Sequence, residues 1–334
     1  MRYSGARVLV TGADGFIGSH LTEALVRAGA QVTALALYNS FDSNGWLDDL
    51  PVEIRNELTV VRGDVRDAAF IGRIVQKQNF IFHLAALIAI PHSYVAAQSY
   101  VDTNVIGSLN IFEAARTHAT ERVVHTSTSE VYGTALTVPI DETHPLQGQS
   151  PYSASKIGAD MMAEAFARSF GLPVVILRPF NTFGPRQSER AIVPSLIRQA
   201  LDPNCAAIMV GDIDTVRDLT FVRDTVSAFI AAGTGELEYG HPYNAGSQSG
   251  QTIADLIGLV RSLTQCSKPL QQEESRFRPR NSEVRKLVAN SRRFQNATGW
   301  KPRIELRRGL EETIGWWRHR LSEGRVRRER EFVM

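Results

Sequence analysis

The sequence predicts an α/β fold in which a parallel sheet is covered by helices on both faces. Two observations predict it: short apolar segments typical of strands alternate with amphipathic segments of helical length, and a glycine-rich turn joins the first strand to the first helix. The chain has 334 residues, of which 43% are hydrophobic and 22% are charged. This length suits two lobes or one elaborated α/β domain, and the composition excludes disordered and fibrous classes.

The predicted elements follow one another in a regular order. The first strand starts at Arg7 and ends before Gly12, and the first helix, 16–28, ends at Gly29. Further strands are predicted at 31–37, 58–62, 80–85, 122–126 and 174–178, with helices at 68–78, 99–117 and 151–170. After Arg178 the chain becomes rich in Pro, Gly and Asn. We therefore expect a main domain of residues 1–180 and 217–248, and a smaller, discontinuous C-terminal lobe of residues 181–216 and 249–334.

Charge is distributed unevenly along the chain. The formal net charge is +2, but residues 275–334 hold 17 basic and 7 acidic side chains, so the excess of positive charge lies in the C-terminal segment. Its basic run, 325–330, is interrupted by a glutamate and lacks aromatic residues, which favours a solvated tail and excludes nucleic acid as a partner. The longest apolar run, 80–91, contains His83 and is too short to span a membrane.

The two cysteines, Cys205 and Cys266, form neither a disulfide framework nor a metal-ligand spacing. We therefore expect a cytoplasmic protein without a metal site.

A glycine-rich turn follows the first predicted strand. The sequence Thr11-Gly12-Ala13-Asp14-Gly15-Phe16-Ile17-Gly18 spaces three glycines as GxxGxxG. Glycine allows a positive φ in the turn and lets the backbone approach a pyrophosphate, which the helix N-terminus then stabilises. Between a strand and a helix, this turn predicts a Rossmann-type, doubly wound sheet with a dinucleotide bound at Gly12, Gly15, Phe16, Ile17 and Gly18.

The residues that end the second strand bear on the choice between NAD and NADP. An acid there favours NAD and an arginine favours NADP, but residues 34–40 contain neither. We expect NAD because no local cation is available for a 2′-phosphate, and NADP stays open. Asn39 is expected to hydrogen-bond the ribose, with Tyr38 and Ser40 as further candidates. Asp64, after the third strand, is expected to accept from the adenine amino group or, alternatively, to cap its own loop.

The strongest catalytic signal is Tyr152 and Lys156, which are four residues apart at the start of a helix announced by Ser150 and Pro151. This spacing puts the phenol and the ammonium group on one helix face. We expect Lys156 to lower the pKa of Tyr152 and to hold a ribose. A phenol with a lowered pKa is a usable general base near neutral pH.

With these motifs the chain resembles the extended short-chain dehydrogenase/reductase family over essentially its whole length. The matching stretches are Gly12 to Gly18, His83-Leu84-Ala85-Ala86, Asn104, Tyr152 with Lys156, Arg178-Pro179-Phe180-Asn181, and Arg217-Asp218. The resemblance implies an NAD(P)-binding fold with a tightly held cofactor that acts on a nucleotide-linked sugar, and a homodimer formed by helices 99–117 and 151–170. It adds the cofactor residues Val65, Leu84, Ala85, Ala86 and Asn104. We nominate Asn181, Arg217 and Arg278 for the substrate diphosphate, with Arg280 as the alternative to Arg278.

Within that family, Glu130 in the segment Thr126-Ser127-Thr128-Ser129-Glu130 is the informative residue. The segment is similar to that of nucleotide-sugar 4,6-dehydratases and also to that of UDP-glucuronate decarboxylases. Residues 85–94, 37–41 and 186–188 look most like those of the UDP-N-acetylglucosamine 4,6-dehydratases of the legionaminic acid pathway. By this resemblance Tyr152 takes the O4 proton as hydride leaves C4, Thr128 bonds O4, Glu130 removes the C5 proton as water leaves C6, and hydride returns to C6. Ser129 stands where dTDP-glucose dehydratases carry an acid, so whether Glu130 serves as both base and acid stays open.

Other activities of the same family remain as alternatives. A UDP-glucuronate decarboxylase, a nucleotide-sugar 5,6-dehydratase and a 4-epimerase would each begin with oxidation at C4. A GDP-linked substrate is also compatible with the sequence. A non-enzymatic NAD(P)-sensing module is disfavoured because both Tyr152 and Lys156 are present.

Overall fold

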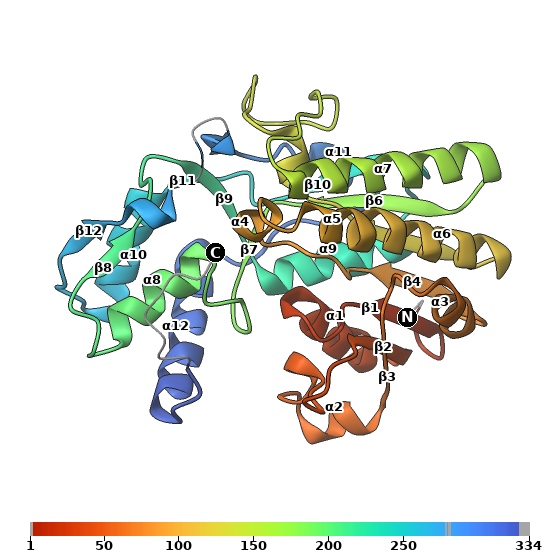
Figure 1. The fold of residues 1–334 in the computed structure, drawn as a ribbon, viewed down its shortest axis with the longest axis horizontal. Helices are drawn as coiled ribbons and strands as arrows, with labels where there is room; N and C mark the ends of the chain where they lie inside the picture. Colours follow the sequence, from red (N-terminus) through yellow and green to blue (C-terminus); the bar gives the residue numbers. More distant parts are fainter. Residues whose placement is uncertain (1–2, 278, 280–281, 327–334) are drawn as a thin grey trace.

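A seven-stranded parallel sheet forms the centre of the larger lobe (Figure 1). The computed structural model describes residues 3–277, 279 and 282–326. The strands lie in the order β10-β6-β5-β4-β1-β2-β3, and every neighbouring pair is parallel. Their bounds are β1 Arg7–Thr11, β2 Gln31–Leu37, β3 Leu58–Gly63, β4 Phe80–His83, β5 Arg122–Thr126, β6 Val174–Pro179 and β10 Pro242–Ala245. The predicted α/β fold with a doubly wound parallel sheet is confirmed.

Helices cover both faces of this sheet. One face packs on α1 (Phe16–Arg27) and α9 (Val222–Thr234), and the other on α3 (Ala68–Val75), α6 (Gly107–Thr117) and α7 (Pro151–Phe170). Strand β1 shows the alternation that this arrangement requires: Val8 and Val10 belong to the first core and Leu9 to the second. Because both faces of the inner strands are buried, β1, β4 and β6 consist mostly of apolar residues and stand out in the sequence. The edge strand β3 is partly exposed.

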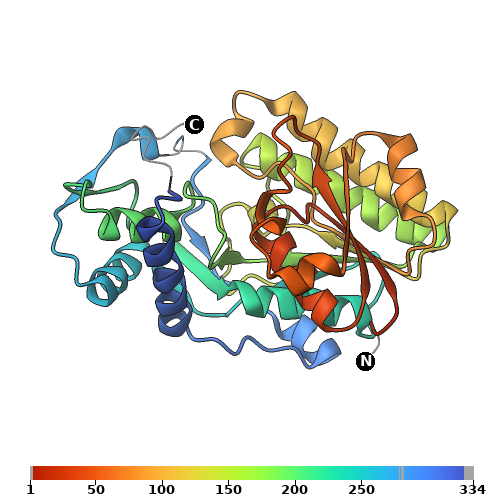
Figure 2. The ribbon, with the colours of Figure 1, turned by 90° about the horizontal axis from the view of Figure 1, so that it is seen from below.

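A smaller lobe lies beside the sheet (Figure 2). Strand β9 (Val216–Phe221) is at its centre and pairs with β7 (Asn181–Phe183), β11 (Gly250–Thr252) and β13 (Lys286–Leu287), while β8 (Ile208–Val210) pairs with β12 (Leu270–Gln272). Helices α8 (Ile192–Leu201), α10 (Ile253–Thr264) and α12 (Leu306–Ser322) pack around these strands, and α11 (Arg292–Thr298) lies against β10. The chain thus leaves the main sheet after β6 and returns to it with β10. The exact domain boundaries stay a prediction.

The helix predicted at 99–117 is interrupted in the structure. Three segments replace it: α5 (Ala97–Tyr100), a π-helical stretch Val101–Ile106, and α6. Inside the π-helical stretch the Asn104 side chain bonds the backbone of Leu87, which lies outside the helix. Such wide turns are found where a helix accommodates a tertiary constraint, and sequence periodicity does not reveal them.

The remaining helices are short: α2 (Val52–Asn56), α4 (Ile90–Ser93), and the 3-10 segments Gly45–Leu47, Ser129–Tyr132 and Glu274–Arg276. In the described part of the chain, no helix combines the length and apolar character needed to cross a bilayer.

Candidate functional site

A large cavity of about 1430 Å³ runs along the carboxyl edge of the main sheet and continues under the smaller lobe. Ligand sites for one small molecule usually measure about 300–1,000 Å³, so this cavity has room for more than one. Its lining combines the glycine turn, the end of β5, the start of α7 and segments of the smaller lobe. Parallel sheets of this kind bind ligands at that edge.

The glycine turn occupies one end of the cavity. Gly12 has φ +66°, and a Cβ there would lie 2.8 Å from the Ala85 nitrogen, while a Cβ on Gly18 would lie 2.0 Å from the Gly12 oxygen. Gly15 caps α1 without a side-chain hydrogen bond, and the first turn of α1 carries no acid. The uncapped N–H groups of this twelve-residue helix therefore face the cavity, which fits the pyrophosphate of a dinucleotide.

Most residues predicted to hold the cofactor line this cavity. The structure brings together the following of them: Gly12, Gly15, Phe16, Ile17, Gly18, Asp64, Val65, Leu84, Ala85, Ala86, Tyr152 and Lys156.

Two predicted cofactor residues, Asn39 and Asn104, do not line the cavity. The Asn39 side chain bonds the backbone of its own loop, at Leu37, Phe41 and Ser43. Asn104 is buried; its Oδ1 accepts from the Leu87 N–H (2.9 Å) and its Nδ2 donates to the Leu87 carbonyl (3.0 Å) and to Ser155 Oγ (2.9 Å). Asn104 thus ties the loop after β4 to α7. Cofactor contacts by these two residues stay a prediction.

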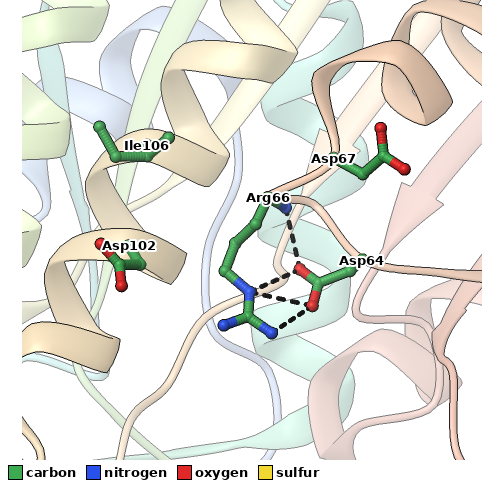
Figure 3. A pocket seen from close by; sticks show the side chains of 5 residues that line it. All are labelled: Asp64, Arg66, Asp67, Asp102 and Ile106. Carbon is green, nitrogen blue, oxygen red and sulfur yellow. Dashed lines mark hydrogen bonds and ion pairs between the residues drawn. The ribbon is translucent and has the colours of Figure 1, made fainter.

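Asp64 lies between the large cavity and a shallower hollow of about 490 Å³ on the surface (Figure 3). Both carboxylate oxygens accept from Arg66, whose guanidinium lies flat beside them. The hydrogen bond from Arg66 lowers the pKa of Asp64, so the carboxylate is ionised at neutral pH. Its remaining lone pairs leave it able to accept from an adenine amino group.

Helix α7 positions Tyr152 and Lys156. Ser150 caps it by accepting from the Ser153 N–H (3.1 Å), and Pro151 occupies its first turn. Tyr152 is buried and packs edge-on against Tyr100, with ring centroids 6.3 Å apart. The Lys156 ammonium donates to the Thr126 carbonyl at the end of β5 (2.6 Å). Both side chains therefore point to the edge of the sheet where a ligand binds.

The pKa values at this position differ from the expectation. Burial raises the pKa of Tyr152; a hydrogen bond from Thr128 lowers it, while the nearby Glu130 carboxylate raises it further. Burial lowers the pKa of Lys156 to about 8, and Asp160 partly offsets that effect. The lowered phenol pKa expected from Lys156 is not found, because the lysine is directed to a backbone carbonyl and burial dominates.

The segment after β5 carries Thr128, Ser129 and Glu130 into the cavity. Thr128 begins the 3-10 helix Ser129–Tyr132 and accepts the Glu130 N–H (3.2 Å). Glu130 is only 8% exposed. Tyr152 lines the same cavity. The predicted acid, hydroxyl and phenol thus face one ligand space.

A buried ionic network centred on Asp160 lies next to the segment that follows β5. Asp160, one turn after Lys156 on α7, is fully buried and accepts from Ser127 Oγ (2.7 Å) and Arg178 Nη2 (2.9 Å), with His125 Nε2 at 3.3 Å. Burial alone would raise the pKa of Asp160, but Arg178 and His125 bring it down to about 2. Burial lowers the pKa of His125 to about 4, so the imidazole is neutral at neutral pH.

The smaller lobe contributes polar groups to the other end of the cavity. Asn181 lines it with a buried Oδ1 that has no hydrogen-bond partner among the described residues. Arg217 lines it as well and pairs with Glu283 (3.0 Å). Arg278 lies outside the described residues. Arg276, which the sequence reasoning missed, lines the cavity and pairs with Glu273.

Two acidic cavity residues that sequence reasoning missed, Asp14 and Glu283, lie in loops. Asp14 and Glu283 had no spacing that distinguished them from surface acids, although Asp14 lies inside the recognised glycine turn. No group of three His, Cys, Asp or Glu side chains in the described ranges is arranged to hold a metal ion.

Comparison with known proteins agrees with this geometry. The family described as GDP-mannose 4,6 dehydratase matches residues 9–313. A dTDP-glucose 4,6-dehydratase of Actinoplanes sp. is 30% identical over 318 residues, covering 93% of this chain and 98% of that protein. A UDP-glucose 4-epimerase of Mycolicibacterium smegmatis is 31% identical, covering 94% and 99%.

A solved structure with the same fold contains the cofactor. DesIV, a dTDP-glucose 4,6-dehydratase from Streptomyces venezuelae with NAD bound, superposes with a TM-score of 0.84 at 29% identity, covering 95% of this chain and 98% of that one.

Proposed function

The chain belongs to the NAD-dependent epimerase/dehydratase family of extended short-chain dehydrogenases/reductases, and from this membership we propose that it is a nucleotide-sugar 4,6-dehydratase. Nucleotide-sugar epimerase or dehydratase activity is common to its relatives. One observation carries the finer assignment: Glu130 brings a buried carboxylate into the cavity that Tyr152 also lines. An epimerase needs only to oxidise and reduce C4, whereas elimination of water across C5 and C6 needs a base at C5.

The residues at the glycine turn and at α7 fit NAD. The cofactor, when bound, would supply a hydride acceptor for C4 and a hydride donor for C6. The α1 N-terminus would hold its pyrophosphate, and Lys156 would bond its ribose. A positive charge at the nicotinamide would also favour the ionised form of the neighbouring Tyr152 phenol, opposing the effect of burial.

The side chains around C4 to C6 of the sugar have separate tasks in this proposal. Tyr152 accepts the proton of the O4 hydroxyl, and Thr128 bonds the same oxygen and orients it. The oxidised C4 makes the C5 proton acidic, and Glu130 removes it as the C6 hydroxyl leaves. Ser129, buried in the cavity wall, is a far weaker donor than an aspartic acid, so Glu130 passes the proton on to the leaving oxygen.

We propose UDP-N-acetylglucosamine as the substrate. Leu87, Ile88 and Ile90 line the cavity near α7 and provide an apolar surface for an acetamido methyl group. The side chain of Asn181, whose Oδ1 has no hydrogen-bond partner among the described residues, and the guanidinium of Arg217 would contact the sugar nucleotide. Arg278 would be a further donor to the diphosphate.

A panel of nucleotide sugars tests both parts of the proposal. The purified protein is incubated with UDP-, GDP- and dTDP-linked hexoses, UDP-glucuronate included, and products are examined by mass spectrometry. Loss of one water from UDP-N-acetylglucosamine is expected, and deuterium placed at C4 should be found at C6. Retention of the label elsewhere would indicate a 5,6-dehydratase. Loss of carbon dioxide from UDP-glucuronate, or an isomeric product of unchanged mass, would replace the proposal by a decarboxylase or a 4-epimerase.

The variant Glu130→Gln tests the base directly. Dehydration is expected to fall by about a hundredfold to ten-thousandfold, the usual contribution of a general base, while NAD binding is retained. Glu53→Gln on α2, an exposed residue away from the cavity, is the matched control and should keep full activity. Full dehydration by the Glu130 variant would show that another group removes the C5 proton.

We further propose a homodimer built on α7 and the neighbouring segment 97–117. Val101, Ile106 and Met161 expose apolar side chains on these helices, with 44%, 41% and 43% of their surface accessible. A second copy that covered them would remove this apolar surface from water. Light scattering measures the mass in solution, and Met161→Glu should shift it toward that of a monomer.

A further inference from the structure

An aspartate lines the cavity at the end occupied by the glycine turn, next to strand β2. Asp14, in the glycine turn, lines the cavity, and its Oδ2 accepts the N–H of Leu37 at 3.1 Å. Leu37 is the last residue of β2. Strand β2 ends without an acidic residue of its own. Asp14, from the turn that follows β1, places a carboxylate at the end of β2 instead.

We propose that Asp14 is the ribose-binding and NAD-selecting residue of this protein. A carboxylate that uses one oxygen for the Leu37 N–H keeps its second oxygen for a ribose hydroxyl of the cofactor. The same charge would repel the 2′-phosphate of NADP. The assignment concerns cofactor choice and holds whichever nucleotide sugar the protein converts.

Backbone contacts fix the position of this carboxylate. The Asp14 carbonyl accepts the Trp46 N–H at 3.0 Å, and a Cβ on Gly45 would lie 2.6 Å from that carbonyl oxygen. The loop after β2 therefore packs directly against the residue. Gly45 has φ +59°, a conformation that favours glycine and permits this close approach. Asp14 is thus held from two sides, by β2 and by the loop that follows it.

The cations at this end of the cavity are engaged with acids. Arg62 on β3 stands opposite Ala36 of β2 in the sheet register, but its guanidinium donates to Asp42 and Asn44. Arg66, which lines the cavity, is paired with Asp64 through both carboxylate oxygens. Neither arginine is therefore placed to compensate the repulsion between Asp14 and a 2′-phosphate.

Equilibrium binding of the two cofactors tests the proposal without any sugar substrate, so its outcome is independent of the dehydratase assignment. Bound nucleotide is removed first, and the dissociation constants of NAD⁺ and NADP⁺ are then measured by titration calorimetry. Wild-type protein should bind NAD⁺ at least about a hundredfold more tightly. Asp14→Asn keeps an acceptor for the Leu37 N–H but removes the charge, and its NADP⁺ affinity should rise by about tenfold or more.

Two further variants complete the design. Asp14→Ala also removes the ribose acceptor and should weaken NAD⁺ binding by about tenfold. Glu53→Gln, an exposed residue of α2 away from the cavity, removes one negative charge from the same lobe and should leave both constants unchanged. Circular dichroism confirms that each variant is folded. The proposal is overturned if the NAD⁺/NADP⁺ ratio of Asp14→Asn stays within twofold of wild type, or if wild type binds both cofactors equally.

Discussion

Replacement of Asp160 by asparagine should destabilise the protein far more than removal of a charge at the surface. The Asp160 carboxylate is fully buried and accepts hydrogen bonds from Ser127 and Arg178. Its pKa is lowered from 3.8 to about 2, although burial acts in the opposite direction. The difference corresponds to about 2 kcal/mol of stability from ionised Asp160.

The substitution also leaves the Arg178 guanidinium buried without its counter-charge. Removing one partner of a buried ion pair typically costs about 3–5 kcal/mol, and we expect Asp160→Asn to fall in that range. The control is Glu164→Gln, four residues later on the same helix, whose carboxylate pairs with the exposed Arg168. Surface pairs of this kind contribute about 0–1 kcal/mol.

Urea unfolding at pH 7, followed by circular dichroism, measures both variants against wild type. The pH dependence provides a second check. Because the folded-state pKa is lowered, the stabilisation is fully present above pH 3.8 and is lost as pH falls through about 2. The gap between wild type and Asp160→Asn should therefore narrow in acid. A loss below about 1 kcal/mol at pH 7, or a gap that does not change with pH, would refute the reasoning.

Three more predictions concern the turn, the lysine and the loop after β4. Gly12→Ala should abolish NAD binding in a calorimetric titration, because φ is +66° and the new Cβ would lie 2.8 Å from the Ala85 nitrogen. Its control is Gly72→Ala, inside α3, where a Cβ would have no neighbouring atom within 4 Å. This control should stabilise the protein by about 0.4–1 kcal/mol. Activity should fall as pH rises above about 8, where Lys156 loses its proton, and Lys156→Arg should move that fall to higher pH in a profile of kcat. Asn104→Ala removes three hydrogen bonds in the interior and should cost about 2–4 kcal/mol in urea unfolding.

Local sequence chemistry predicted several elements closely. Helix α7 was expected at 151–170 and occupies Pro151–Phe170, because a serine cap, a first-turn proline and Gly171 in the left-handed conformation define its ends locally. The strands were predicted from their apolar runs, which two-sided burial imposes on a parallel sheet. Element boundaries set by such short-range signals can be read from the chain alone.

Where a side chain has several possible partners, residue type did not predict which of them it bonds. Asn104 was assigned to the cofactor, yet its amide holds the Leu87 backbone and Ser155. Asn39 was assigned to a ribose, and its side chain bonds its own loop. Amide side chains bond equally well to backbone, ligand and water, so residue type does not decide between them.

The sequence by itself determined the doubly wound sheet, the glycine turn at its edge, and the neighbourhood of Tyr152, Lys156 and Glu130, because parallel strands bring their carboxyl ends to one side. Only the tertiary structure decided which groups pair there: Asp14 with the Leu37 backbone, Asp160 with Arg178, and Lys156 with the Thr126 carbonyl. These partners are 18 to 30 residues apart in the chain. Their contact depends on strand register and on the packing of helices against the sheet, which no local pattern encodes.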